Sequence, residues 1–125
     1  LKLDIPTSVI DIGEEAFSNC KALKSIILPY RLRKVQKKTF YTCVSLRNVT
    51  FGLFLESIDE SAFQYCRSLN DLYIKAFDIS IGPNAFGDCS NLNKCEINAT
   101  CCILAPNAFP PGKKMIMNCE KLVTS

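Results

Sequence analysis

The sequence contains no histidine. Without it, the chain cannot form the Cys–His or Ser–His pairs that activate most cysteine and serine nucleophiles. It also has no C-x-x-C pair, the commonest start of a zinc site, and no Gly-rich phosphate loop among its five glycines. These absences predict a protein that is not an enzyme and uses no metal or cofactor.

Long apolar runs and a strong charge of one sign are missing too. No apolar stretch approaches the ~18 residues that cross a bilayer, and no charged leader followed by an apolar segment opens the chain. We therefore expect no membrane span. The net charge of +3 is weaker than the footprint of a nucleic-acid binder, so no such partner is expected. The first residue is not methionine, and we expect a piece of a longer protein.

What the chain does contain is an internal repeat. Phenylalanine recurs every 23 residues, and cysteine and then leucine follow it at intervals of three. The columns are Phe17, Phe40, Phe63, Phe86 and Phe109; Cys20, Cys43, Cys66 and Cys89; and Leu23, Leu46, Leu69 and Leu92. So many columns in one register indicate copies of a single structural unit.

Each copy reads as a strand followed by a compact turn. An L-x-x-I-x-L segment alternates apolar and variable positions, which predicts a short strand with one buried face. Segments such as "FLESID", around an apolar column that includes Ile58, are expected to form a second short strand. In A-F-x-x-C, Phe and Cys lie three apart, which favours a short helical or 3₁₀ turn. Stacked copies would share one continuous core, as in a solenoid.

The stretch "LKLDIPTSVIDIGEEAFSNC" resembles the BspA-like leucine-rich repeats, a class with 23 residues per copy. The resemblance implies a right-handed leucine-rich-repeat solenoid of the α/β type with about five coils and short parallel strands on one face. We expect one domain over residues 1–125, with residues 110–125 as a C-terminal cap and a final strand near 115–117. Members of this family are often surface or secreted proteins that bind host or extracellular-matrix proteins. This implies a protein-interaction or adhesion module at the cell surface or outside the cell.

The cysteines fall into two groups. The four in the repeat column are expected to be buried thiols of the core, because free cysteine behaves as a small hydrophobe. Cys95 and Cys101 occupy columns that point inward, whereas the repeat gives Cys102 and Cys119 no direction. A disulfide from Cys102 to Cys119 would staple the end of the solenoid. Spacing leaves the redox state of these last four cysteines open.

A partner surface is predicted on the outward positions of the strands. The third and fifth positions of each L-x-x-I-x-L segment face away from the core and vary in chemistry while the core columns stay fixed. After Lys2 and Asp4, these positions hold Ser25, Ile27, Asn48, Thr50, Asp71, Tyr73, Lys94 and Glu96. Ile27 and Tyr73 are the expected anchors, because exposed apolar and aromatic side chains gain most from burial at an interface.

Two other readings stay open. The stretch "YRLRKVQKK" is predicted as an anion-binding alternative, for a glycosaminoglycan or lipid, through Arg31, Arg33, Lys34, Lys37 and Lys38. The second alternative is an intracellular scaffold in the cytoplasm. Asn48 and Asn98 begin N-x-T sequons that accept glycans in a eukaryotic secretory route. The N-terminal edge of the sheet is expected to be open to self-association.

Overall fold

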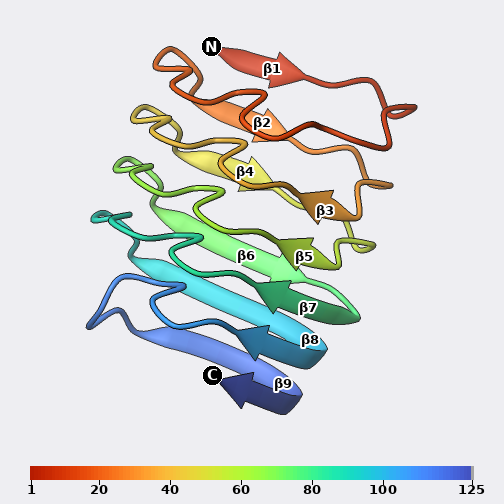
Figure 1. Ribbon diagram of the computed structural model, residues 1–125, viewed down its shortest axis with the longest axis vertical. Coiled ribbons are helices and arrows are strands. Elements are labelled where there is room, and N and C mark those ends of the chain that lie inside the picture. Colours follow the sequence, from red (N-terminus) through yellow and green to blue (C-terminus); the bar gives the residue numbers. More distant parts are fainter. Residues whose placement is uncertain (125) are drawn as a thin grey trace.

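A computed structural model describes residues 1–124 as a stack of parallel β-coils (Figure 1). The first row of strands comprises β1 (Lys2–Asp4), β2 (Ser25–Ile27), β4 (Asn48–Thr50), β6 (Asp71–Lys75) and the start of β8 (Lys94–Leu104). The second row comprises β3 (Lys34–Val35), β5 (Ser57–Ile58), β7 (Asp78–Ile81) and the end of β8. Strand β9 (Met115–Thr124) follows. About five stacked coils and both predicted rows of strands are confirmed.

The pairing of the strands keeps the register of the repeat. Ser25 lies opposite Lys2 on one side and Asn48 on the other, and Ile26 lies between Leu3 and Val49. Strands β1, β2 and β4 form one sheet, and β3, β5, β7, β8 and β6 form a second sheet to which β9 adds. The first half of β8 pairs with β6 and its second half with β7, so β8 joins the two rows.

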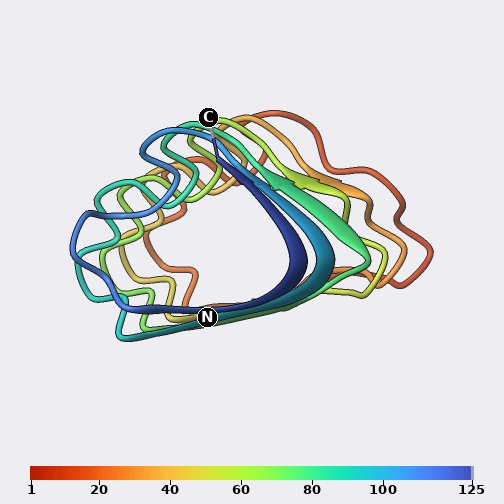
Figure 2. The same cartoon turned by 90° about the horizontal axis from the view of Figure 1, so that it is seen from below.

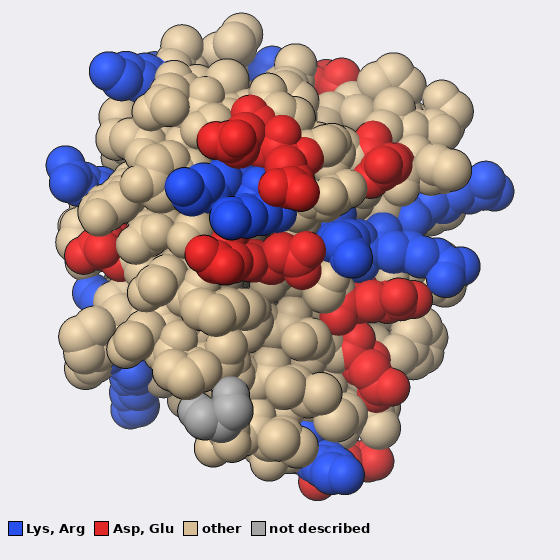
Figure 3. Space-filling view, in the orientation of Figure 1, with Lys and Arg blue, Asp and Glu red and all other residues tan. Residues whose placement is uncertain are grey.

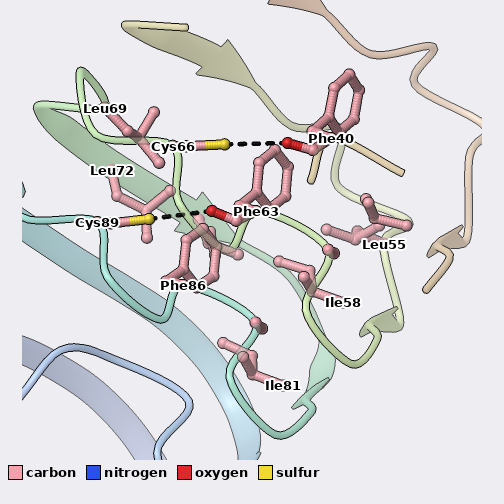
Figure 4. Packing of buried hydrophobic residues seen from close by; sticks show 14 of the residues in the cluster. Phe40, Leu55, Ile58, Phe63, Cys66, Leu69, Leu72, Ile81, Phe86 and Cys89 are labelled. Carbon is pink, nitrogen blue, oxygen red and sulfur yellow. Dashed lines mark hydrogen bonds between the residues drawn. The ribbon is translucent and has the colours of Figure 1, made fainter. Parts of the chain in front are cut away.

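The coils wind around a common axis (Figure 2). The buried side chains of the core lie inside them. The rings of Phe40, Phe63 and Phe86 are fully buried and stack face to face, with centroids 5.0 and 5.1 Å apart. Phe17 and Phe109 extend this stack at its two ends. Figure 4 shows the rings of Phe40, Phe63 and Phe86 beside the leucine and isoleucine columns. One coil has too little apolar surface to fold alone, and stacking supplies the rest.

The A-F-x-x-C segments are turns, so the predicted helical or 3₁₀ turns are wrong. In the copy around Phe63, Ser61 and Tyr65 have left-handed φ angles of 56° and 65°, which interrupt a helix. The backbone N–H of Phe63 bonds to Ala85 O of the next coil, while Gln64 N–H bonds back to Ser61 O. In a continuing helix, the N–H of each interior residue bonds to a carbonyl of the same segment. Here alternate donors tie the coil to its neighbour, and residues 1–124 contain no helix.

The corner between the two rows explains why the later strands are longer. Pro29 starts a turn in the second copy, where Leu32 N–H bonds to Pro29 O, and Gly52 does the same in the third. Proline has no N–H for a ladder, so the strand ends there. The corresponding residues in the next copies are Lys75 and Asn98, which can continue a strand. Strand β6 therefore includes Lys75, and β8 runs through Asn98 without a break.

This change at the corner corrects one prediction about the cysteines. Cys101 was expected to face inward with Leu32 and Leu55, which are buried. At this corner the alternation of β8 shifts by one residue: Cys95 and Ile97 are buried, and the next fully buried residue is Cys102, whereas Cys101 is only half-buried. Cys101 lies opposite Asp78, which is exposed. A polar residue at position 78 was the signal for this shift.

The C-terminal segment adds one more layer to the stack. The predicted strand begins at Met115, as expected, and runs on to Thr124 along β8. A disulfide joins Cys102 of β8 to Cys119 of β9, with Cα atoms 6.3 Å apart, so the predicted pairing is confirmed. Ser125, the last residue of the predicted cap, lies outside the described residues.

Candidate partner-binding face

The eight predicted partner-binding residues share one outer face of the stack. They lie on β2, β4, β6 and β8, at positions that alternate with buried residues such as Ile26 and Leu72. Strand pairing sets Ser25 beside Asn48, and Tyr73 beside Glu96. Six of the eight are exposed, and Ser25 and Glu96 are half-buried. The repeat thus brings residues far apart in sequence into two neighbouring rows.

This face is hollowed between β4 and β6. The two strands belong to different sheets, so the ladder is interrupted there. The hollow has a volume of about 380 Å³ and is lined by six of the predicted residues together with Val49 and Leu72. Those six are Asn48, Thr50, Asp71, Tyr73, Lys94 and Glu96. Ser25 and Ile27 lie outside it, on β2.

The two predicted anchors are both accessible. Ile27 is 47% exposed and Tyr73 is 55% exposed. The same row contains a third apolar side chain that the sequence did not predict. This is Ile116 on β9, which lies opposite Glu96 and is 45% exposed. The tail fits the repeat poorly in sequence, so its register could not be assigned. Across the face, Ile27, Tyr73 and Ile116 are separated in turn by Thr50 and Glu96.

The structure divides the predicted anion-binding residues between two places. Arg31, Arg33 and Lys34 line a hollow of about 640 Å³ at the corner of the coil. Lys37 and Lys38 lie in the turn segment, where the Lys38 ammonium sits 5.1 Å from the centroid of the Tyr41 ring. The five positive charges therefore do not form one surface.

Acidic residues flank this basic stretch in the coils on either side. The Glu15 N–H bonds to Lys37 O, and the Lys38 N–H bonds to Glu60 O, so the acidic and basic segments are neighbours. Figure 3 shows basic side chains between acidic bands on one face of the molecule. Arg33 and Glu56 form an ion pair of 3.5 Å, which is the only one within residues 1–124. The neighbouring carboxylates weaken the attraction of this face for a polyanion.

Three of the four cysteines in the repeat column are buried as predicted, and their thiols bind the backbone of the preceding coil, whereas Cys20 in the first coil is only half-buried. Cys43, Cys66 and Cys89 each donate a hydrogen bond of 3.1 to 3.2 Å, to Phe17 O, Phe40 O and Phe63 O respectively. Burial raises the pKa of Cys43 to about 11 and that of Cys89 to about 12, and it also raises the pKa of Cys66. A nucleophilic thiol needs a lowered pKa, so these groups are suited to packing.

Outside this cysteine column, the described residues form no other candidate catalytic or metal site. Burial raises the pKa of Cys95 to about 12 as well, and Cys95 has no hydrogen-bonded base. Residues 1–124 hold no group of three His, Cys, Asp or Glu side chains placed to bind a metal ion. Over the same residues, no helix is long and apolar enough to span a membrane.

The two sequons differ in their surroundings. Asn48 is exposed on β4 and makes no side-chain hydrogen bond within residues 1–124. Asn98 is half-buried, its Nδ2 donates to Glu96 Oε2 at 2.7 Å, and its Oδ1 accepts from Asn118 Nδ2 at 2.7 Å. A glycan on Asn98 would break this network, whereas one on Asn48 would cover the hollow between β4 and β6.

The stacked parallel coils with a 23-residue register are typical of one kind of repeat protein, and the sequence profile of the BspA type leucine rich repeat region matches residues 1–116 in six copies. The chain belongs to the BspA type leucine-rich repeat family. Leucine-rich repeat domains are generally protein-interaction modules, and proteins of this family are typically not enzymes. No curated protein matches this BspA type chain significantly.

Solved structures show the same fold. A leucine-rich repeat protein from Bacteroides ovatus is 19% identical with a TM-score of 0.62; the match covers 98% of this chain but 33% of that one. For the T. pallidum leucine-rich repeat protein, the identity is 20%, the TM-score 0.65, and the coverage 98% and 72%. A leucine-rich repeat protein from Bacteroides capillosus is 21% identical with a TM-score of 0.58, and the match covers 93% of this chain and 75% of that one. The chain therefore spans about a third of the length of the B. ovatus protein.

Proposed function

We propose that this chain is a non-enzymatic interaction or adhesion module that binds a protein partner through the face of β2, β4, β6 and β8. The observation that carries the proposal is the division of labour within each strand. The inward positions stay apolar in every copy, while the outward positions change in chemistry from copy to copy and include two accessible apolar anchors, Ile27 and Tyr73. Solenoids present extended surfaces of this kind to partners.

The fold does not require these anchors. In the same outward column, other copies carry Asp4, Thr50 and Glu96, so polar side chains are accommodated at this position. Ile27 and Tyr73 therefore expose apolar surface where the repeat tolerates a charge. Interface anchors have this character, and truncating one commonly costs 2 kcal/mol or more, which is about a thirtyfold loss of affinity.

We propose an extracellular setting, at the cell surface or in the secreted fraction. The Cys102–Cys119 disulfide supports it, because such bonds persist in oxidising compartments. The free thiols of the Cys43 column do not argue against it, because buried thiols with a raised pKa react slowly. An intracellular scaffold remains the alternative, and the fraction of Cys102 found oxidised in protein from its native cell decides between them.

The test of the face uses substitutions that the repeat itself supplies. Ile27→Asp copies Asp4, and Tyr73→Glu copies Glu96, so both variants should fold. The double variant is compared with wild type for binding to intact cells and to extracellular-matrix extract, and circular dichroism checks the fold. Tyr30→Thr removes an equally exposed aromatic ring off this face and copies Thr7, which makes it the matched control. Loss in the double variant alone supports the face, and binding equal to wild type contradicts it.

A further inference from the structure

A second surface of the molecule carries apolar side chains that the fold does not explain. Phe54 is 51% exposed and Phe77 is 59% exposed, and their ring centroids lie 6.4 Å apart. Both rings stand in one repeat column, at the corner between the two rows of strands. The other residues of this column are Ser8, Arg31 and Thr100. The solenoid therefore accommodates polar side chains here, and two adjacent coils nevertheless present phenylalanine to solvent.

A neighbouring column repeats the pattern. Ile103 is 44% exposed, whereas its counterparts in earlier copies are Asp11, Lys34, Ser57 and Ser80. Ile103 lines a hollow of about 400 Å³ together with Phe54 and Phe77. This hollow has an apolar floor, since Leu55 and Ile79 are buried beneath it. The exposed apolar groups are thus gathered around one depression.

The apolar hollow is continuous with a basic one. Phe54 also lines the 640 Å³ hollow that contains Arg31 and Lys34. Neither cation has a carboxylate within 4 Å in residues 1–124, whereas Arg33 is paired with Glu56. The one carboxylate of the basic hollow, Asp11, accepts a hydrogen bond from Gln36 at 2.9 Å. Along the stack the surface therefore changes from two unpaired cations to two phenylalanines.

We propose that this corner binds an extended peptide segment that carries a carboxylate beside a large apolar side chain. The carboxylate pairs with Arg31 and Lys34, and the apolar side chain enters the hollow of Phe54 and Phe77. Successive coils are about 4.8 Å apart, so Arg31 and Phe77 are separated by roughly 10 Å. An extended chain covers that distance in about three residues. The expected motif places the acidic residue two or three positions from the apolar one.

The charges of the corner favour a peptide over an anionic membrane. Glu56, which is paired with Arg33, and Asp78 also line the apolar hollow. A flat anionic surface that reached Phe54 and Phe77 would press against these carboxylates, which is unfavourable. A peptide can satisfy the cations with one side chain and place a neutral one beside Glu56 and Asp78.

The test selects a random 12-residue peptide display library on the full chain and, in parallel, on Phe54→Ser/Phe77→Thr. These replacements occur in the same column as Ser8 and Thr100, so the fold should be kept. We expect wild type to enrich peptides with the stated motif. A fluorescent peptide from that set should lose about tenfold or more in affinity, both for the phenylalanine variant and for Arg31→Ser/Lys34→Ser. Ile27→Asp/Tyr73→Glu should bind it as wild type does, which separates this site from the face proposed above.

Other outcomes would overturn the assignment. Selection without a consensus, a consensus that lacks the carboxylate, or equal binding to the phenylalanine variant would each contradict it. Sedimentation velocity tests whether a second copy of the chain occupies the corner. A wild-type dimer that is lost in Phe54→Ser/Phe77→Thr would assign the corner to self-association and contradict the peptide. Binding to phosphatidylcholine/phosphatidylserine vesicles that depends on the two phenylalanines would assign it to a membrane and contradict the peptide as well.

Discussion

The thiol of Cys66 donates a hydrogen bond of 3.2 Å to the carbonyl oxygen of Phe40, 26 residues earlier and one coil away (Figure 4). The same bond joins Cys89 to Phe63 and Cys43 to Phe17. Each of these cysteines therefore links its own coil to the preceding one, because its thiol donates to a backbone carbonyl oxygen of that coil. This relationship assigns the repeated cysteine to structure, and it leaves recognition to the residues on the outer surfaces.

Replacing Cys66 by alanine removes both this bond and a buried sulfur atom. We expect Cys66→Ala to lower the free energy of unfolding by about 1 to 2 kcal/mol, the sum of one buried hydrogen bond and a small cavity. Urea unfolding followed by circular dichroism measures the change. Cys101→Ala is the matched control, because Cys101 is half-buried and makes no such bond, and it should stay within about 0.5 kcal/mol of wild type. Equal losses for the two variants would rule out the linking role.

The raised thiol pKa values predict that stability declines at alkaline pH. Burial raises the folded-state pKa of Cys89 and Cys95 to about 12, above the value of about 9 for an open thiol. A group whose pKa is raised by folding contributes fully below its unfolded pKa, and the contribution is lost as the pH rises toward the folded pKa. The free energy of unfolding should therefore fall between about pH 9 and pH 12. In Cys95→Ala this fall should be shallower, and an identical slope would contradict the burial effect.

Truncation of the phenylalanine stack should be costly only in the core column. Phe63 is fully buried between Phe40 and Phe86. Phe63→Ala should lower the free energy of unfolding by about 3 to 5 kcal/mol, the usual cost of such a cavity. Phe54→Ser removes an equally large ring from the surface and should change it by less than about 1 kcal/mol. Thermal unfolding of both variants measures the contrast, and similar costs at the two positions would be inconsistent with the assigned core.

Two glycines give a matched test of the corner turn. A Cβ atom at Gly52 would stand 2.6 Å from the Cα of Tyr30, whereas one at Gly13 would meet nothing within 4 Å. Gly52→Ala must push the backbone of the neighbouring coil and should cost about 1 to 3 kcal/mol. Gly13→Ala should be neutral or stabilise by up to about 1 kcal/mol, because it restricts the unfolded chain. Chemical unfolding ranks the two, and the reverse order would refute the close approach at Gly52.

The sequence predicted the columns because burial repeats with the copies. Phe63, Cys66 and Leu69 keep their spacing in every complete copy, and the structure buries all three. It did not predict the turn conformation, because Phe and Cys three residues apart suit a helix and a turn equally well. The left-handed angles at Ser61 and Tyr65 depend on bonds to the next coil, which a single copy does not reveal.

The outer surfaces were predictable in part. The fifth strand position identified Ile27 and Tyr73 as exposed, because alternation along a strand is strict. Phe54 and Phe77 were overlooked, although comparing them with Ser8 and Thr100 in the same column would have marked them. The direction of Cys101 was missed for a different reason. It depends on a one-residue shift in the alternation of β8 at the corner, which the earlier copies with buried Leu32 and Leu55 do not show.

The most direct test of the recognition face is photo-crosslinking from within it. Tyr73 is replaced by the photoreactive p-benzoyl-phenylalanine, the protein is added to intact cells or matrix extract, and adducts are identified after irradiation. The same replacement at Arg67, which is exposed in a turn segment away from both proposed sites, reports random encounters. The account predicts a discrete protein adduct from position 73 that is absent from position 67 and is lost when Ile27→Asp is added. The same adducts from both positions, or none from position 73, would contradict it.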